Sequence, residues 1–246
     1  MVLRRRRHAL TRHVGRVFGL TPNVDNQCMK FEAVLFDCDG VLVDSEAITC
    51  GALRDMLEES GWTLTLQQCM AHFVGHAVRN RRDLIEAHTG KPLTDAFMDE
   101  FYRRRNLRLD NEITAIAHIH PAVQHVFHAC QGQIACASGA DRFKINLMLG
   151  KVGLLDFFEG RIFSGHEVPH TKPAPDVYLA AAAHLGKDPK RCLAVEDTPV
   201  GVAAGVAAGA TVWGYAAHGQ GQVLRDAGAA HVFHCMTEFP ALFDAG

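Results

Sequence analysis

The sequence predicts an α/β protein built on a parallel sheet, with a helical segment inserted near its beginning. Short apolar runs typical of buried strands recur along the chain, and residues with helical spacing fall between them. Residues 46–116 keep helical spacing with no convincing strand. The chain has 246 residues, enough for one full core and a second, smaller unit.

Composition and charge exclude several classes of protein. Hydrophobic residues make up 48% of the chain and the net charge is −2, so neither nucleic acid nor an anionic membrane is an expected partner. No run approaches the roughly 18 apolar residues of a membrane span. The eight cysteines never form a Cys-x-x-Cys pair, and several lie in apolar runs. This usage favours reduced thiols and a cytoplasmic location.

The first 28 residues differ from the rest. Arg4 to Arg7, Arg12 and Arg16 are offset only by Asp25, and no apolar period is sustained. The segment lacks the continuous apolar centre of a secretory signal. From this composition we predict that residues 1–28 form a disordered basic extension. Met29 stands immediately before the first expected strand, so the folded protein is expected to begin there.

The expected elements follow in chain order. A strand over 32–37 runs into an acidic turn, and a helix begins at Glu46 and ends at Ser60-Gly61. Further helices are expected near 66–76, 79–89 and 95–108, the last with Thr94 as its N-cap. Later strands are expected over 133–137, 161–164, 192–195, 211–215 and 231–233, and later helices near 142–149, 175–185 and 199–208.

The first strand ends in Asp37-Cys38-Asp39-Gly40, which places two carboxylates at the carboxyl edge of the sheet. Open α/β sheets bind their ligands at this edge. Buried like charges are costly unless a cation or a shared proton offsets them. Such a pair suits phosphoryl transfer, in which one carboxylate attacks, the other moves a proton, and a divalent metal lies close by. The alternative is a turn in which both aspartates only cap the backbone.

Three later segments carry polar groups that could converge with this turn. Ser138-Gly139 follows a strand and offers a hydroxyl and an N–H to an anion. Lys172 lies among prolines that fix its position, and Glu196-Asp197 forms a second acidic strand end that could complete a carboxylate cage for a hard cation. Taken singly, each has a simpler interpretation as a turn, a solvated lysine or a helix cap.

These four segments, present and in order, resemble the motifs of the haloacid dehalogenase (HAD) superfamily of phosphohydrolases. The resemblance implies a Rossmann-like core formed by residues 29–45 and 117–246. The long gap after the first motif resembles the all-helical cap of phosphoglycolate phosphatase-like and β-phosphoglucomutase-like members, which implies a cap over 46–116.

The resemblance also implies roles for the motif residues. Asp37 would be the nucleophile that forms an aspartyl-phosphate, and Asp39 would protonate the leaving oxygen and then deprotonate water. Lys172 would stabilise the phosphoryl charge. The phosphoryl oxygens would also be bound by Ser138 and the Gly139 N–H. The implied Mg²⁺ ligands are Asp37, the Asp39 carbonyl, Asp197 and, directly or through a water, Glu196.

The implied function is a phosphatase acting on a small phosphorylated metabolite, as a monomer or homodimer. In the cap, the candidates for contact with the leaving group are Gly75, His76 and Arg79. The alternative is that they are simply a loop glycine beside solvated side chains. A phosphosugar mutase is the rival activity, although Thr49 stands where mutases typically carry histidine. The third hypothesis is a protein that binds a phosphorylated metabolite without catalysis. Such a protein would be expected to have lost Asp37, Asp39 or Lys172, and all three are present.

Overall fold

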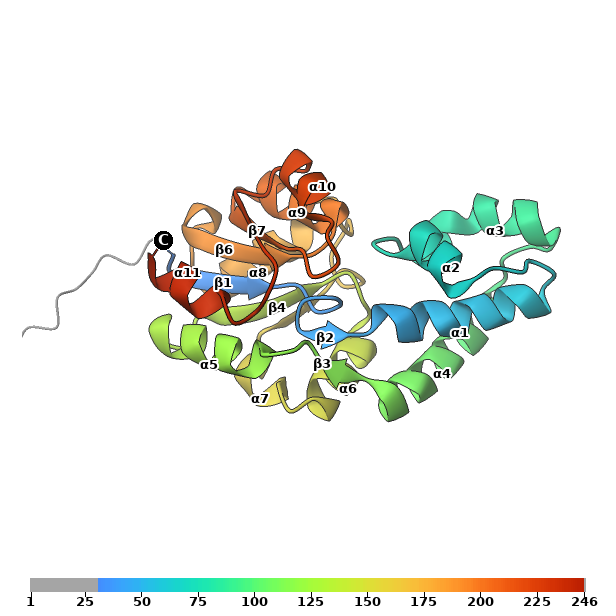
Figure 1. Ribbon diagram of the computed structural model, residues 1–246, viewed down its shortest axis with the longest axis horizontal. Helices are drawn as coiled ribbons and strands as arrows, with labels where there is room; N and C mark the ends of the chain where they lie inside the picture. The colour runs from blue at the N-terminus through green and yellow to red at the C-terminus, as the bar shows by residue number, and fades with distance from the viewer. Residues whose placement is uncertain (1–30, 246) are drawn as a thin grey trace, which may run out of the picture.

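A computed structural model describes residues 31–245, which fold around one six-stranded parallel sheet (Figure 1). The strand order is β5-β4-β1-β6-β7-β8. The strands are β1 (Ala33–Phe36), β4 (Ile134–Ser138), β5 (Ile162–Ser164), β6 (Cys192–Glu196), β7 (Thr211–Tyr215) and β8 (His231–Phe233). The predicted Rossmann-like sheet is therefore confirmed. The expected extension over 1–28 lies outside the described residues.

Helices cover both faces of the sheet because successive strand side chains point to opposite sides. Val34 and Phe36 face one helical layer, and Ala33 and Leu35 face the other. The first layer contains α5 (Ile119–Ala129), α6 (Arg142–Lys151), α7 (Leu155–Phe158) and α11 (Phe239–Ala245). The second contains α8 (Asp176–His184), α9 (Pro199–Ala207) and α10 (Gly221–Asp226).

The glycine- and alanine-rich helix α9 lies unusually close to the sheet. A side chain at Gly205 would overlap Val212 of β7. Thr198 caps the helix by accepting a hydrogen bond from the Gly201 N–H, and Pro199 occupies the first helical position. The small residues of α9 thus allow it to pack closely against the sheet.

Residues 46–112 form a helical segment that projects from the carboxyl edge of the sheet (Figure 1). It consists of α1 (Glu46–Glu59), α2 (Leu66–Phe73), the 3-10 turn η1 (Val78–Arg81), α3 (Arg82–Thr89) and α4 (Asp95–Glu112). Thr94 accepts a hydrogen bond from the Phe97 N–H, which confirms it as the N-cap of α4. Leu53, Met56, Phe73, Met98 and Phe101 belong to a hydrophobic core of the segment's own.

The chain enters and leaves the helical segment through a two-stranded antiparallel ribbon, β2 (Val43–Asp44) and β3 (Thr114–Ala115). The prediction of a strandless segment through residue 116 is therefore wrong at its end. The pairing joins residues about seventy positions apart and two residues show no period, so the local pattern could not reveal it. No helix of the described residues is long and apolar enough to cross a membrane.

Candidate active site

The three strands at the centre of the sheet bring the predicted motifs together. β1 lies between β4 and β6, with Phe36 level with Cys136 and with Val195. Asp37 follows β1, Ser138 ends β4 and Glu196 ends β6. The parallel order therefore places all three residues at one edge, where open α/β sheets hold ligands.

Asp37, Glu196 and Asp197 form a buried acidic cluster. One carboxylate oxygen of each lies within 4.8 Å of the others. Asp197 Oδ1 is buried and has no hydrogen-bond partner among the described residues. Burial and the neighbouring carboxylates of Glu46, Asp37 and Glu196 raise the pKa of Asp197 well above its usual value. An unpartnered buried carboxylate oxygen beside two further carboxylates is a donor set that fits a hard divalent cation.

Two glycines make room for this cluster. Gly40 has a φ of +78°, and a Cβ there would overlap the carboxylate of Asp197. A Cβ at Gly201, in the first turn of α9, would overlap the carboxylate of Glu196. Both acidic side chains therefore occupy space that a larger residue would fill.

Lys172 joins the cluster from the loop before α8. Its Nζ lies 2.7 Å from Asp37 Oδ1 and 2.7 Å from Glu196 Oε1, and it donates to the Ala137 carbonyl at 2.9 Å. The side chain is 9% exposed, which rules out a solvated surface lysine. Burial opposes its charge, but Asp37 and Glu196 raise the pKa of Lys172 well above its usual value.

Lys172 only partly offsets the burial of the nucleophile candidate. Burial raises the pKa of Asp37 to about 7, against the attraction of Lys172, and the carboxylates of Glu196 and Asp39 add to the rise. Tyr178 of α8 donates its hydroxyl to Glu196 Oε1 at 2.5 Å and accepts from Lys172 at 3.1 Å. Glu196 is thus fixed by two partners on one oxygen.

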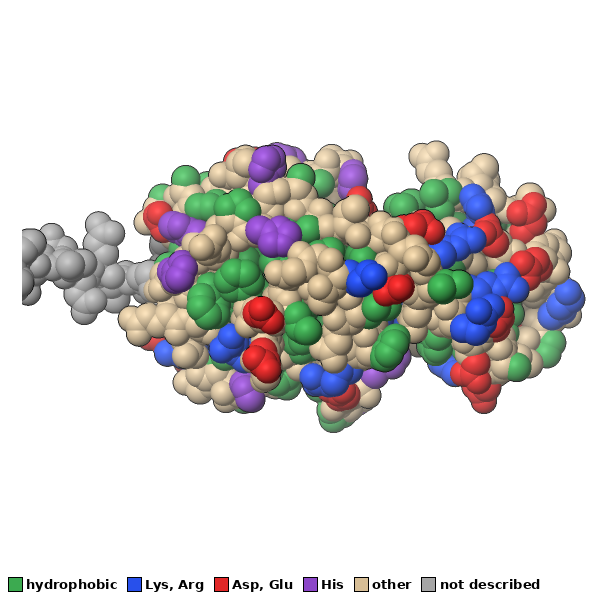
Figure 2. Space-filling view, turned by 90° about the horizontal axis from the view of Figure 1, so that it is seen from below, with side chains coloured by type: hydrophobic (Ala, Val, Ile, Leu, Met, Phe, Trp, Pro, Cys, Tyr) green, Lys and Arg blue, Asp and Glu red, His purple; other side chains and the backbone are tan. Residues whose placement is uncertain are grey.

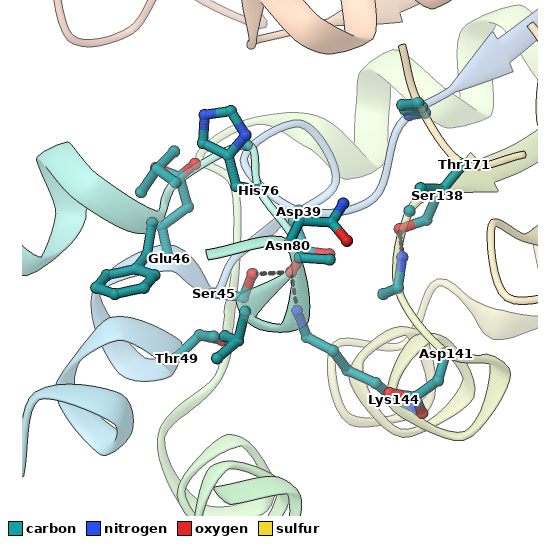
Figure 3. A pocket seen from close by; sticks show the side chains of 18 of the residues that line it. Asp39, Ser45, Glu46, Thr49, His76, Asn80, Ser138, Asp141, Lys144 and Thr171 are labelled. Atoms are coloured by element: carbon teal, nitrogen blue, oxygen red, sulfur yellow. Dashed lines mark hydrogen bonds and ion pairs between the residues drawn. The ribbon is translucent and has the colours of Figure 1, made fainter. Parts of the chain in front are cut away.

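Asp39 has its own set of partners, as Figure 3 shows. Its Oδ1 accepts hydrogen bonds from Ser45 Oγ and from Lys144 Nζ, the latter at 2.5 Å. Burial alone would raise the pKa of Asp39, but Lys144 and Ser45 hold it below its usual value. Asp37 and Asp39 therefore lie in electrostatically different surroundings, as different roles require.

A cavity of about 440 Å³ separates the core from the helical segment. Asp37, Asp39, Ser138, Gly139 and Lys172 line it on the core side. Ser138 is buried, and its Oγ accepts from the Ala140 N–H at 3.1 Å. The predicted phosphate-binding residues thus lie beside the acidic cluster and open onto the same space.

The candidates from the helical segment line this cavity too. Gly75, with a φ of +76°, His76 and Arg79 all contribute to its wall. Arg79 is paired with Asp95 at 2.9 Å and remains partly exposed. Burial, with Arg81 nearby, lowers the pKa of His76.

Arg105 of α4 also lines the cavity. Lys144, Tyr178 and Arg105 are helical residues of the site that escaped the sequence analysis. Each lies on a helix at a position where its residue type is ordinary, so no spacing or turn marks it. Tyr178 lies in the first helix after Lys172, but the burial that gives its hydroxyl a partner is a property of the fold and is not marked in the sequence.

Comparisons with known proteins identify the family of this chain. The family model of haloacid dehalogenase-like hydrolases matches residues 31–209. The 6-phosphogluconate phosphatase of Escherichia coli is 30% identical over 189 residues, covering 76% of this chain and 84% of the relative. Hexitol phosphatase B of Escherichia coli is 29% identical, covering 72% of this chain and 79% of the relative.

A solved structure gives the same result. The crystal structure of a HAD family hydrolase from Deinococcus radiodurans, with bound phosphate and sodium, is 33% identical. The alignment covers 89% of this chain and 97% of that one, with a TM-score of 0.73. The chain therefore belongs to the haloacid dehalogenase-like hydrolase family. Within that family it is a phosphoric monoester hydrolase, which confirms the predicted class of enzyme.

Proposed function

We propose that this protein is a Mg²⁺-dependent phosphatase that works through an aspartyl-phosphate intermediate. Its substrate is a small phosphorylated metabolite: a sugar phosphate, a phosphorylated sugar acid or phosphoglycolate. The observation that carries the proposal is the contact of Lys172 with both Asp37 and Glu196, beside the unpartnered oxygen of Asp197. This arrangement combines a nucleophile, a fixed cation and a place for a second cation.

Asp37 is the proposed nucleophile. Lys172 holds its Oδ1, and the other oxygen attacks phosphorus as the ester P–O bond breaks. Asp39 gives a proton to the leaving oxygen. Water then attacks the aspartyl-phosphate, Asp39 takes the proton of that water, and phosphate leaves with Asp37 regenerated. A bound phosphoryl dianion raises the pKa of a nearby carboxyl, which favours the protonated Asp39 that the first step needs.

Ser138 Oγ and the Gly139 N–H are the proposed ligands of the phosphoryl oxygens. The proposed metal ligands are the Asp37 and Asp197 carboxylates and the Asp39 backbone carbonyl. When bound, Mg²⁺ supplies positive charge that neutralises the phosphoryl oxygens. Lys172 and Tyr178 already occupy Glu196 Oε1, which favours contact of Glu196 with the metal through a water.

The helical segment is the proposed cap of the enzyme. In this division the cap comprises residues 46–116, and the catalytic core comprises 29–45 and 117–246. The separate hydrophobic core of the helices and their narrow connection through β2 and β3 support it. Closure of the cap over the cavity excludes water and brings Gly75 and Arg79 to the leaving group.

One observation bears on the mutase alternative. Thr49 of α1 lines the cavity, and its buried hydroxyl has no partner among the described residues. The β-phosphoglucomutase-like members that this chain resembles typically carry histidine at this position. Threonine cannot exchange protons at neutral pH as histidine does, so hydrolysis is favoured over transfer between hydroxyls of a sugar.

The test is phosphate release from a panel of phosphorylated metabolites, with Mg²⁺ or with chelator, for the wild type and Asp37→Asn. We expect turnover that requires Mg²⁺ and is lost in Asp37→Asn. Asp110→Asn, which changes an exposed carboxylate of α4, serves as the matched control and should retain activity. Conversion of β-glucose 1-phosphate to glucose 6-phosphate without phosphate release would instead establish a mutase. Absence of both reactions would favour a binding protein.

A further inference from the structure

Two buried cations line the cavity outside the acidic cluster. Arg105 comes from α4 of the helical segment, and Lys144 comes from α6 of the core. Their side chains are 7% and 8% exposed. Charged side chains are rarely buried to this degree without a specific partner. Their contacts therefore show which of their donors are used within the protein and which are free.

Arg105 is held rigidly. Its Nη2 bonds Asp141 Oδ2 at 2.9 Å, and its Nε and Nη2 both bond Asn106 Oδ1, at 3.0 and 2.8 Å. Its guanidinium carbon lies 4.8 Å from the ring centroid of Tyr102. A guanidinium has five N–H donors, and the two on Nη1 have no hydrogen-bond partner among the described residues. This nitrogen is therefore available to a ligand in the cavity.

Lys144 is aimed into the cavity from the other side. The Asp141 side chain that pairs with Arg105 also caps α6 by accepting from the Lys144 backbone N–H at 2.9 Å. From this fixed start the side chain reaches Asp39, as Figure 3 shows. An ammonium group has three donors, and within residues 31–245 only the one to Asp39 is used. Two donors of Lys144 therefore remain for a ligand.

The carboxylate of Asp141 links the two elements, because it bonds the guanidinium of Arg105 and caps the helix that carries Lys144. Basic side chains alternate with a few acids over the lower face of the helical segment (Figure 2). A solvent-exposed pair of the helical segment, such as Arg103 with Glu100, carries little binding energy. The side chains of Arg105 and Lys144 are instead largely buried at the cavity wall, where a bond to an anion is stronger than on the open surface.

We propose that Arg105 and Lys144 bind a second anionic group of the substrate, on the leaving-group side of the cavity beyond Asp39. The inference rests on the proposed phosphatase activity and narrows its substrate class to metabolites with two acidic ends. The second group is a carboxylate or a second phosphate, since both accept from a guanidinium fork and an ammonium group. A polyol phosphate would offer only neutral hydroxyls to the same donors.

The test compares substrates that differ only at the remote end. 6-Phosphogluconate carries a carboxylate where glucitol 6-phosphate carries a hydroxymethyl group, and glucitol 1,6-bisphosphate carries a second phosphate. We expect the wild-type kcat/KM for the better anionic substrate to exceed that for glucitol 6-phosphate at least about 10-fold. The ranking of the two anionic substrates identifies the remote group.

Variants at the two cations then test the assignment. Lys144→Met and Arg105→Lys should each reduce the preference for the anionic substrate by about 10-fold or more, mainly through KM. Lys144 also contacts Asp39, so activity on all substrates will fall; the ratio between substrates is the diagnostic quantity. Lys151→Met, an exposed lysine at the end of the same helix, should leave the ratio unchanged. Equal kcat/KM values for anionic and neutral substrates, or an unchanged ratio in both variants, would overturn the inference.

A binding measurement separates this inference from the phosphatase proposal. In Asp37→Asn with Mg²⁺, calorimetric titration should give a dissociation constant about 10-fold lower for the anionic substrate than for glucitol 6-phosphate. This difference should appear even if no panel member is hydrolysed. Equal affinities would refute the role of Arg105 and Lys144 whether or not the enzyme turns over.

Discussion

In the absence of divalent metal, the free energy of unfolding of this protein should fall as the pH rises. Burial raises the pKa of Asp37 from 3.8 to about 7 when no metal ion lies beside it, even with Lys172 in contact. Between about pH 4 and pH 7 the folded state therefore keeps a proton on Asp37 that the unfolded chain has already released. The stabilisation is complete below pH 4 and is lost as the pH rises through 7. Each pKa unit corresponds to about 1.4 kcal/mol, so the full loss is about 4 kcal/mol. About 3 kcal/mol of this loss falls between pH 5 and pH 8.

The measurement is urea unfolding at pH 5 and pH 8, in chelator and in Mg²⁺. In chelator the wild-type free energy of unfolding should be lower at pH 8. Mg²⁺ should restore it, since a bound cation favours the ionised carboxylates. Asp37→Asn lacks the titrating group, so in chelator its free energy of unfolding should change less with pH. If wild type and Asp37→Asn show the same pH dependence in chelator, the argument from the buried carboxylate is wrong.

Two further substitutions test the supports of the cluster. Tyr178→Phe removes the hydroxyl that bonds Glu196 and should lower the free energy of unfolding by about 1–3 kcal/mol. The hydroxyl of Tyr215 has no hydrogen bond to a described residue, so Tyr215→Phe should lower the free energy of unfolding by less. Gly201→Ala introduces a Cβ that overlaps Glu196, so it should displace this carboxylate from Lys172 and lower kcat about 10-fold or more. Gly150→Ala, where the added Cβ meets only Leu155 at 3.9 Å, should retain kcat.

The central strands and their polar ends could be predicted from the sequence because both signals are local. A short apolar run followed by Asp-x-Asp or Glu-Asp marks a buried strand and its carboxyl end together. The parallel sheet then requires adjacent strand ends to meet, which is why Asp37, Ser138 and Glu196 converge. No knowledge of the helices is needed for this step.

The positions of Lys144, Arg105 and Tyr178 required the tertiary structure. Each contacts a partner that lies on another element. Lys144 of α6 contacts Asp39 in the turn after β1, and Arg105 of α4 contacts Asp141 at the N-cap of α6. Tyr178 of α8 contacts Glu196 at the end of β6. A helix shows which face is apolar, but not which polar side chain of the other face meets a carboxylate from elsewhere. The exposed Lys151 and the buried Lys144 lie on the same helix, and local spacing does not distinguish them.

The charges at the acidic cluster imply an order of binding. Asp37, Glu196 and Asp197, when ionised, carry three negative charges, and Lys172 offsets one of them. The pair of Asp39 and Lys144 is already balanced. A phosphoryl dianion would meet two uncompensated negative charges in a poorly solvated site, where repulsion is strong. One divalent cation removes this excess, and Lys172 already occupies the space between Asp37 and Glu196. The ionised Asp37 that the proposed mechanism needs therefore requires a cation at the proposed site beside Asp197. We predict that metal binds the free enzyme and that substrate binds the metal-loaded enzyme.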